Sequence, residues 1–361
     1  MRILHTESSS GWGGQEIRIL REAEGMRKRG HHLVFAVQIG GKLVARARDA
    51  GFTVYELPFS KPHAFKTVYK LVKICRTHQI QLVNTHSSLD AWLGGIAARF
   101  AGVKIIRTRH LSTPTRGGLN SRLLYKTLAD FVVTTSSCII PSIATQGRIP
   151  LSSVQCVPTG IDPATVTSDL QKAFAFRDSL GLKPSDILVG TLCVVRSWKG
   201  ILDLFQAATL LKKHPHIKWV IVGGGYLDDY KPKLAELGLE GIVTFTGHLE
   251  NPFDALQAID IFTLLSTAHE GISQASLQAA YLQKPLITTS IGGLPEVCLS
   301  GQTGIVVPPF SSDKVAEAVL RLAEDPQRRS QWGRQAKELV MERFTFEHTL
   351  HSMESIYNKF S

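Results

Sequence analysis

The amino-acid sequence predicts an α/β fold built from two doubly wound parallel sheets. Short apolar segments, typical of buried strands, alternate with amphipathic helical patterns along the whole chain. Such alternation indicates parallel sheets that are covered by helices. The chain is 361 residues long, which exceeds one ordinary compact core, so we expect about two domains.

The first series of strands predicts a domain over residues 1–162. Helical patterns at 15–30 and 65–80 separate some of its strands. The polar stretch 161–170 lacks a strong strand and marks the boundary. The expected strands are 2–5, 32–38, 53–57, 82–86, 104–110, 131–136 and 154–160.

A second series predicts a domain over residues 163–344. Its expected strands are 187–195, 219–225, 243–247, 261–266, 285–290 and 304–308. Ligands of doubly wound sheets bind beyond the carboxyl ends of the strands. Two such sheets in tandem usually hold the ligand in the cleft between them, so the loops that follow the strands are where chemistry is expected.

Charge is distributed unevenly between the two halves. Residues 1–160 carry 22 Lys and Arg against 8 Asp and Glu, a net +14, whereas residues 161–361 carry 19 against 22, a net −3. A half this basic attracts a polyanion, either a nucleic acid or an anionic membrane face, unless it is simply a solvated basic surface. The basic segments lack stacking aromatic residues and any nucleic-acid reading motif, so no nucleic-acid partner is expected.

The five cysteines are scattered, and no two of them form a CxxC pair. This usage suits a reducing compartment rather than a disulfide framework. No apolar run reaches the ~18 residues of a membrane-spanning helix, and the chain starts directly with a strand-like segment. The expected location is therefore the cytoplasm.

Two glycine-rich loops follow expected strands. Gly11, Gly13 and Gly14 precede a helix, where backbone N–H groups can hold a phosphate or contact a sugar; the alternative is a tight turn that needs positive φ. This loop does not fit the GxGxxG pattern, so an NAD site is not expected. The second loop, 223–225, is interpreted as a tight turn near a ligand, because Asp228 at the third glycine position would repel a pyrophosphate.

Arg196 and Lys199 follow the first strand of the second half, and Gly200 comes next. Two cations at the carboxyl end of a strand suit a diphosphate, because Arg binds it bidentately and Lys acts as a point charge. The alternative is an exposed basic loop.

The segment HEGISQASLQAA, 269–280, runs from a short loop into a helix that starts near Ser273. Its first turn has small side chains, so the helix N-terminus is open to an anion. Glu270 carries the wrong charge for a phosphate and is better used as an acceptor for sugar hydroxyls; alternatively it caps the helix. Gln278 lies roughly 7–8 Å further along the helix axis, which suits a ligand with a sugar at one end and a nucleoside at the other.

These segments resemble a GT-B glycosyltransferase, specifically the retaining family 4 (glycosyltransferase group 1). The resemblance covers nearly the whole chain, and the stretch 269–297 is its longest and most specific part. Shorter matches are GWGGQE (11–16), THSSLDAWLGGIAAR (85–99), RTRH (107–110), VPTGID (157–162), RSWKG (196–200) and VTFTGHL (243–249).

The resemblance implies that a sugar moves from a nucleotide-sugar donor with retention at the anomeric carbon. Glu270 would hold the donor sugar and His110 would line the reacting face, as catalytic residues. The implied donor-binding residues are Gly14, Arg196, Lys199, Gly247, His248, Leu249, Ser273, Gln274, Ala275 and Gln278. Gly13 and His86 would lie on the acceptor side; alternatively, His86 is a histidine at a strand end whose hydrogen bonds are satisfied within the protein. No metal or other cofactor is expected, because the chain lacks a DxD motif and its cations and helix end can stabilise the leaving diphosphate.

Two positions depart from the family pattern. Gln278 replaces the second acid of the E-x7-E pair, which accepts hydrogen bonds from the ribose, so donor affinity is expected to be lower. Many members also carry an arginine five or six residues before the clamp lysine, where this chain has Val194 and Cys193. Arg196 resembles the RxxKG variant of some members and keeps the clamp.

The acceptor is expected on the basic first domain. Lys66, Lys70, Lys73 and Arg76 recur at helical spacing, which predicts a basic face opposite Phe65, Val68, Val72 and Cys75. With the basic segment 107–126, this face favours peripheral association with the cytoplasmic face of a membrane and an envelope acceptor, saccharide or lipid-linked, of the lipopolysaccharide type. Any surface helix on a sheet shows a similar pattern.

The amphipathic tail 344–360 is expected to cross back onto the first domain, completing it with a helix over about 345–361. Two other functions stay open at this point. A sugar-nucleotide epimerase would need an acid/base pair in the first domain, and Glu7, Glu16 and Asp90 form no obvious one. A non-catalytic sugar-nucleotide binder would explain Gln278.

Overall fold

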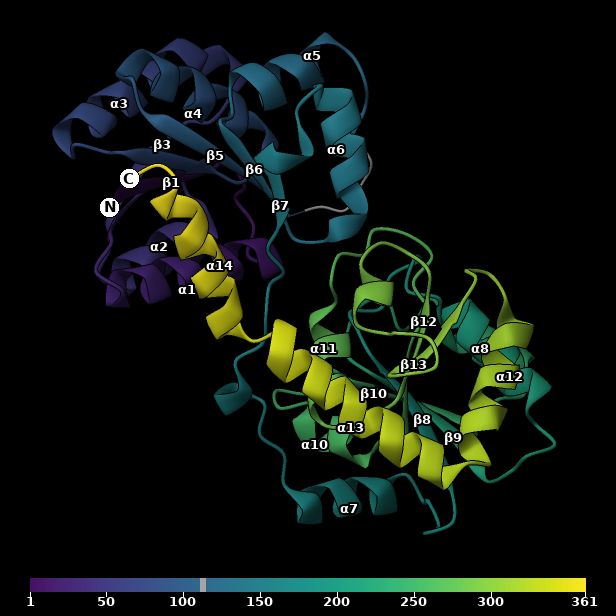
Figure 1. Ribbon diagram of the computed structural model, residues 1–361. Coiled ribbons are helices and arrows are strands. Elements are labelled where there is room, and N and C mark those ends of the chain that lie inside the picture. Colours follow the sequence, from purple (N-terminus) through teal and green to yellow (C-terminus); the bar gives the residue numbers. More distant parts are fainter. Residues whose placement is uncertain (111–114) are drawn as a thin grey trace. The chain divides into compact units, whose positions relative to one another are not determined.

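A computed structural model describes residues 1–110 and 115–361, so residues 111–114 of the basic segment lie outside the described residues. The chain divides into two compact units (Figure 1). Unit 1 comprises Met1–Thr159 and Glu347–Ser361, and unit 2 comprises Gly160–Phe346. The sequence placed these boundaries after residues 162 and 344.

Unit 1 contains a parallel sheet of seven strands in the order β3-β2-β1-β4-β5-β6-β7. Its central strands are almost completely buried, which explains their continuous apolar runs. The strands are β1 (Arg2–Glu7), β2 (His32–Gln38), β3 (Thr53–Leu57), β4 (Leu82–Thr85), β5 (Lys104–Arg109), β6 (Phe131–Thr134) and β7 (Val154–Cys156).

Helices cover this sheet, and one of them comes from the far end of the chain (Figure 1). They are α1 (Gly14–Lys28), α2 (Lys42–Asp49), α3 (Ala64–Thr77), α4 (Ser88–Ala101), α5 (Leu119–Arg122), α6 (Ile140–Gly147) and α14 (Phe346–Asn358), with a π-helical turn at Leu123–Thr127. Helix α14 packs tightly on α1, since a Cβ added to Gly25 would lie 2.5 Å from Cδ1 of Leu350.

One face of this sheet has an apolar core. Its strands contribute Leu4, Val34, Val83 and Ile105, and helices α3 and α4 contribute further buried apolar residues. Several neighbouring residues of the same strands are buried but polar, namely His5, Asn84 and Thr108. Because side chains alternate along a strand, unit 1 has an apolar layer and a layer rich in polar groups.

Unit 2 contains a parallel sheet of six strands in the order β10-β9-β8-β11-β12-β13. The strands are β8 (Ile187–Leu192), β9 (Ile217–Val222), β10 (Val243–Gly247), β11 (Ile261–Leu264), β12 (Leu286–Thr289) and β13 (Gly304–Val307). The helices are α7 (Leu170–Ser179), α8 (Ile201–Leu210), α9 (Lys231–Glu236), α10 (Phe253–Ala258), α11 (Gln274–Tyr281), α12 (Ser312–Ala323) and α13 (Pro326–Arg343).

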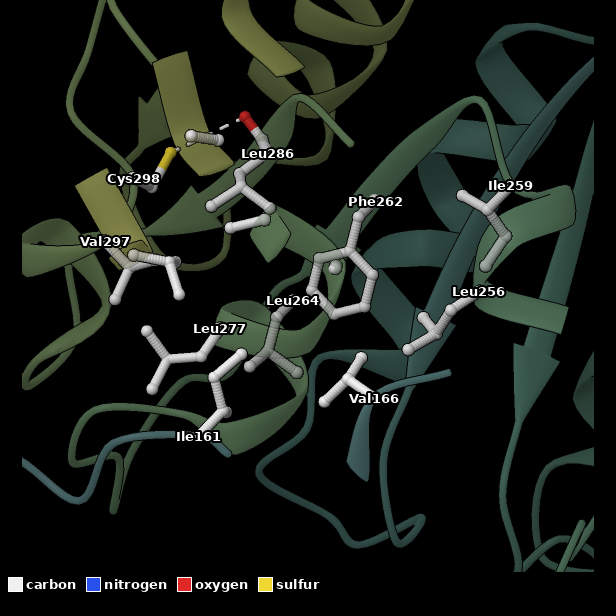
Figure 2. Packing of buried hydrophobic residues seen from close by; sticks show 14 of the residues in the cluster. Ile161, Val166, Leu256, Ile259, Phe262, Leu264, Leu277, Leu286, Val297 and Cys298 are labelled. Atoms are coloured by element: carbon white, nitrogen blue, oxygen red, sulfur yellow. Dashed lines mark hydrogen bonds between the residues drawn. The ribbon is translucent and has the colours of Figure 1, made fainter. Parts of the chain in front are cut away.

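The core of unit 2 is dominated by apolar side chains. Phe262 and Leu264 of β11 lie at the centre of a cluster that Leu256, Leu277 and Leu286 complete (Figure 2). The thiol of Cys298 donates to the Leu286 carbonyl at 3.5 Å within this cluster. Its buried apolar surface provides the main stabilisation of the unit.

The two chain segments that join the units are paired with each other. Ile161 forms a parallel bridge with Thr345, and its N–H donates to the carbonyl of Phe344 at 2.9 Å. A Cβ on Gly160 would lie only 2.2 Å from the carbonyl group of Thr345. Glycine is therefore required for this close backbone approach.

Candidate functional site

Both sheets reverse their strand order once. In unit 1 the reversal lies between β1 and β4, and in unit 2 it lies between β8 and β11. Ligands of doubly wound sheets bind at the carboxyl ends of the strands at such a point. The predicted site residues follow these and neighbouring strands, so each unit carries its own group of candidate site residues.

The loop after β8 carries Arg196 and Lys199. Its backbone runs beside the glycine loop after β9, where Val195 pairs with Gly225 and accepts a hydrogen bond from the N–H of Tyr226 at 3.2 Å. The guanidinium of Arg196 lies over the Tyr226 ring, 4.7 Å from its centroid. The glycine loop 223–225 thus acts as the turn that the sequence suggested, and it positions the loop with the two cations.

Lys199 forms an ion pair with Glu270, which follows β11. The hydroxyl of Ser266 also donates to Oε1 of Glu270, at 2.6 Å. The side chains of Lys199 and Glu270 are 18% and 7% exposed, so solvent screens this pair only weakly. Both contacts use Oε1, so Oε2 keeps its lone pairs for another donor.

Glycines permit the close approach of the loops that hold this pair. A Cβ on Gly200 would lie 2.0 Å from the Leu265 carbonyl oxygen, and a Cβ on Gly292 would lie 1.8 Å from that of Glu270. Both glycines also have positive φ, 69° and 59°. The position of the ion pair therefore depends on backbone contacts that no other residue allows.

Helix α11 begins directly after this pair. Ser273 is its N-cap, and its hydroxyl accepts from the N–H of Ser276 at 3.3 Å. The alternative in which Glu270 caps the helix is therefore wrong. Gln274 and Ala275 form the first turn, where the helix dipole is positive. Gln278 is the fifth residue of α11 and half-buried.

The loop after β10 holds the remaining predicted donor-binding residues. The carbonyl of Gly247 accepts from the N–H of Gly223 at 2.9 Å, which joins this loop to the next one along the sheet. His248 is exposed, whereas Leu249 packs against the apolar core of unit 2. Leu249 therefore has a role in packing, in addition to the donor contact that the sequence predicts.

In unit 1 the glycine loop leads into α1. Gly13 is the N-cap, and its N–H donates to Oε2 of Glu16 at 2.8 Å. Neither Gly13 nor Gly14 has positive φ, and a Cβ on Gly14 would meet nothing within 4 Å. The tight-turn alternative is therefore wrong for these two residues. The fold itself does not require glycine at position 14, and its absence of a side chain leaves the helix end uncovered.

Two carboxylates accept hydrogen bonds from residues next to this loop. Glu7 of β1 accepts hydrogen bonds from the Ser9 N–H and from the side chains of Gln15 and Ser87. Asp90 accepts from Oγ1 of Thr6 at 3.0 Å and from the N–H of Ser87 at 2.9 Å. Burial and the Asp90 charge raise the pKa of Glu7 to about 7, and burial also raises the pKa of Asp90.

Three histidines from neighbouring strands form a chain of hydrogen bonds. Nδ1 of His5 lies 2.8 Å from Nε2 of His86, and Nδ1 of His86 lies 3.0 Å from Nε2 of His110. Burial lowers the pKa of His5 to about 3, and burial with neighbouring positive charge holds the pKa values of His86 and His110 well below the usual range. All three rings are therefore neutral at physiological pH.

The sequence analysis included His86 and His110 but missed His5. The signal was present, since three expected strands carry a histidine at or near the carboxyl end. Only the strand order, with β1 beside β4 and β4 beside β5, shows that these histidines are neighbours.

A second buried network, also missed, lies on α1. Arg18 donates to the Val157 carbonyl at 2.7 Å and to Oγ1 of Thr159 at 2.8 Å, and its Nε lies 3.6 Å from Oε2 of Glu22. Glu22 accepts from the hydroxyl of Tyr357 in α14 at 2.7 Å. Both Arg18 and Glu22 are fully buried, and the hydrogen bond from Tyr357 connects this ion pair of α1 to α14 inside unit 1.

The exposed face of α3 differs from the sequence prediction in one residue. Phe65 was expected on the apolar face, but it is 94% exposed, and Tyr69 is 71% exposed. Phe65 lies in the first turn of the helix, where helical periodicity alone does not decide burial. The exposed face therefore combines two aromatic rings with Lys66, Lys70, Lys73 and Arg76. The expectation that the basic segments lack aromatic residues able to stack is wrong for this helix.

Within residues 1–110 and 115–361, no group of three or more His, Cys, Asp or Glu side chains is arranged to hold a metal ion. In the same part of the chain, no helix is long and apolar enough to cross a bilayer.

Comparison with known proteins adds independent information. The family model of glycosyl transferases group 1 matches residues 173–339, and that of Glycosyltransferase Family 4 matches residues 12–165. An uncharacterised glycosyltransferase of Methanocaldococcus jannaschii is 24% identical over 96% of this chain and 94% of its own length. N-acetyl-alpha-D-glucosaminyl L-malate synthase of Bacillus anthracis is 23% identical over 90% of this chain and 92% of its own length.

Solved structures show the same fold. A glycosyltransferase from Rickettsia africae superimposes with a TM-score of 0.89 at 18% identity, over 99% of this chain and 98% of its own. HepE of Anabaena, solved in complex with UDP, gives a TM-score of 0.86 at 20% identity, over 99% of this chain and 100% of its own. With the two family models, these similarities show that the chain is a GT-B glycosyltransferase and belongs to group 1, family 4.

Proposed function

We propose that this glycosyltransferase moves a sugar from a nucleotide-sugar donor to a saccharide or lipid-linked acceptor of the cell envelope, with retention at the anomeric carbon and without a metal ion. The observation that carries the proposal is the buried Lys199–Glu270 ion pair, which lies directly before the N-terminus of α11 at the strand reversal of unit 2. It combines a sugar-binding carboxylate with groups that attract a diphosphate.

Each of these groups in unit 2 has a distinct role in the proposal. Oε2 of Glu270 accepts hydrogen bonds from the donor sugar's hydroxyls. Arg196, Lys199 and the N–H groups at Gln274 and Ala275 stabilise the charge that develops on the leaving diphosphate. Because these positive groups come from the protein, no divalent cation is needed for the step. The amide of Gln278 offers one acceptor and one donor to the ribose.

Similarities to proteins with known ligands support a nucleotide-sugar donor. The structures of Anabaena HepE contain UDP, UDP with glucose, or UDP-glucose. A galactosyltransferase of Escherichia coli that uses UDP-Gal and a diphosphoundecaprenol-linked acceptor is 26% identical over 72% of this chain and 70% of its own. The outer-core lipopolysaccharide galactosyltransferase WaaB superimposes with a TM-score of 0.80 at 17% identity, over 99% of this chain and all of its own.

The acceptor is proposed to bind to unit 1, near Gly13, His86 and His110. The exposed face of α3 supports a lipid-linked acceptor, because aromatic rings can enter the interface of a bilayer while lysine and arginine side chains bind anionic headgroups. Its aromatic residues Phe65 and Tyr69 are 94% and 71% exposed, so burial in the core does not account for them. The protein is therefore proposed to work at the cytoplasmic face of the membrane.

The first experiment identifies the donor and tests the role of Glu270. Thermal-shift measurements with UDP, GDP, ADP and CMP select the nucleotide, and transfer is then assayed with its sugar conjugates in the presence of EDTA. We expect Glu270→Ala to lose at least ~100-fold in kcat, as for other removed electrostatic groups, while it keeps the affinity for the free nucleotide. Glu240→Ala, at an exposed position, is the control and should match the wild type.

Full turnover of Glu270→Ala, or transfer that EDTA abolishes, would contradict the proposed mechanism. The alternative function is a sugar-nucleotide binder without transferase activity, which Gln278 favours. Nucleotide binding without transfer or hydrolysis for any donor would support that alternative, and Gln278→Glu would then be the variant to examine for regained activity.

The membrane contact is tested with liposomes that contain anionic lipid. We expect the wild type to pellet with them at low salt. The membrane partition coefficient of the double variant Phe65→Ser/Tyr69→Ser should be at least ~100-fold lower, because burial of each ring contributes ~1.5–3 kcal/mol and about 1.4 kcal/mol corresponds to a factor of ten. Phe174→Ser removes an equally exposed aromatic residue from unit 2, where Phe174 is 64% exposed, and should not change pelleting. If Phe174→Ser reduces pelleting as much as the double variant does, the exposed face of α3 is not the membrane contact.

A further inference from the structure

The three histidines of unit 1 are arranged as a single directed chain. The His5 and His86 rings are almost parallel, with centroids 5.1 Å apart and planes at 6°, and the His86 and His110 centroids are 5.3 Å apart. Each contact joins Nδ1 of one ring to Nε2 of the next. The middle ring therefore uses both of its nitrogens inside the chain.

A neutral imidazole carries one proton, so each ring can donate from only one nitrogen. If His5 donates from Nδ1, then His86 accepts at Nε2 and must donate from Nδ1, and His110 carries its own proton on Nδ1. If the direction is reversed, all three rings carry the proton on Nε2. Both arrangements make the same two contacts between the rings. What distinguishes them is whether a proton or a lone pair is left at each end of the chain.

The buried end decides between them. Nε2 of His5 is buried and has no hydrogen-bond partner within the described residues. The Phe35 ring stacks on His5 at 5.6 Å, so the surroundings on that side are apolar. A buried N–H without a partner is rarer in proteins than an unsatisfied acceptor. The arrangement that leaves a lone pair rather than a proton at this atom is therefore favoured.

We propose that His5 and His86 are positioning residues that fix His110 as the tautomer with its proton on Nδ1. His110 then offers an N–H donor to an oxygen of the substrate and has no free nitrogen lone pair with which to act as a base, since its Nε2 already accepts from His86. Its role becomes the orientation of a substrate oxygen rather than proton abstraction.

Nearby charge supports this assignment. Arg18 of α1 is the cation that disfavours protonation of both His86 and His110, and burial acts in the same direction. A second proton on any ring would place a positive charge on a buried chain close to this guanidinium. One proton per ring, on which the directed chain depends, is thus the expected state.

The tautomers are measured directly on the wild-type protein with ¹⁵N-labelled histidine. Long-range ¹H–¹⁵N correlations at neutral pH show which ring nitrogen is protonated, and single histidine variants assign the signals. We expect Nδ1–H on His5, His86 and His110. A proton on Nε2 of His110, or averaging between the two tautomers, would overturn the proposal. This readout does not depend on transferase activity, so it stands apart from the proposed function.

Two variants of His5 test the coupling. His5→Leu removes the donor to His86 and should let His110 exchange between tautomers; if the proposed transfer occurs, kcat/KM should fall about 5-fold, the effect of one neutral hydrogen bond. The amide of His5→Asn replaces Nδ1–H and should restore both the single tautomer and the turnover. An unchanged His110 tautomer in His5→Leu would overturn the coupling. If His5→Leu does not fold, the wild-type measurement still decides the proposal.

Discussion

The two units place their site residues in different ways, although both do so where the strand order reverses. In unit 2 the loops touch through their backbones, and Gly200 and Gly292 allow the contacts that hold Lys199 against Glu270. In unit 1 the site rests on buried side chains that bond to each other, such as the chain from His5 to His110. The first arrangement depends on the absence of side chains and the second on their polar atoms.

This difference predicts different sensitivities. A backbone contact is insensitive to pH but cannot tolerate an added methyl group. A buried polar network tolerates some changes in shape but responds to protonation and to the loss of one partner. The following variants test whether the two units respond in these two ways.

The largest effect is expected for Gly292→Ala in unit 2. The new Cβ would lie 1.8 Å from the carbonyl oxygen of Glu270 at a φ of 59°, so the loop must move or the unit unfold. We expect a loss of more than about 4 kcal/mol in the free energy of unfolding, measured by urea denaturation. Gly14→Ala, where a Cβ meets nothing, is the control and should change stability by less than about 0.5 kcal/mol. Equal stability of the two variants would contradict the backbone-contact explanation.

A smaller loss is expected for Arg18→Met in unit 1, because it leaves Glu22 buried without its partner. We expect about 3 kcal/mol, measured by native-state hydrogen exchange of the amides in α1 and α14. The double variant Arg18→Met/Glu22→Leu removes both charges and should recover most of this loss. A double variant no more stable than the single one would show that the loss comes from the other hydrogen bonds of Arg18, to Val157 and Thr159, and not from the unpaired carboxylate.

The last effect concerns pH and Glu7, and it is the smallest of the three per pH unit, because it is spread over the pH range from 4.5 to about 7. Its pKa is raised to about 7 in the folded protein from an ordinary value of 4.5, so the folded state binds a proton more tightly than the unfolded state. This contribution to stability is complete below pH 4.5 and is lost as the pH rises through 7, at no more than about 1.4 kcal/mol per pH unit. Urea unfolding of the wild type should follow this slope relative to Glu7→Gln. If the unfolding free energies of the wild type and of Glu7→Gln change with pH in parallel, this prediction is wrong.

Much of the fold, and the segments that carry the candidate site residues of unit 2, could be predicted from the sequence, because the sequence patterns that predict them are local. Strand–helix alternation gave both sheets, and Glu270, Ser273 and Gln278 lie within one short segment. Unit 1 was harder, because its network joins residues as distant as Glu22 and Tyr357. The return of α14 to unit 1 was expected and is confirmed. The particular residues that it brings together follow from strand order and helix packing, which leave no periodic signal in the sequence.

The return of α14 also has a consequence for synthesis on the ribosome. Residues 160–346 are contiguous, so unit 2 can complete its fold as soon as they have emerged. Unit 1 begins earlier but needs Leu350, Met353, Ile356 and Tyr357 from the last helix, all of them buried. The unit whose synthesis starts first is therefore completed after unit 2, and until α14 has emerged, Asn84 and Glu22 lack the hydroxyl of Tyr357 as a partner.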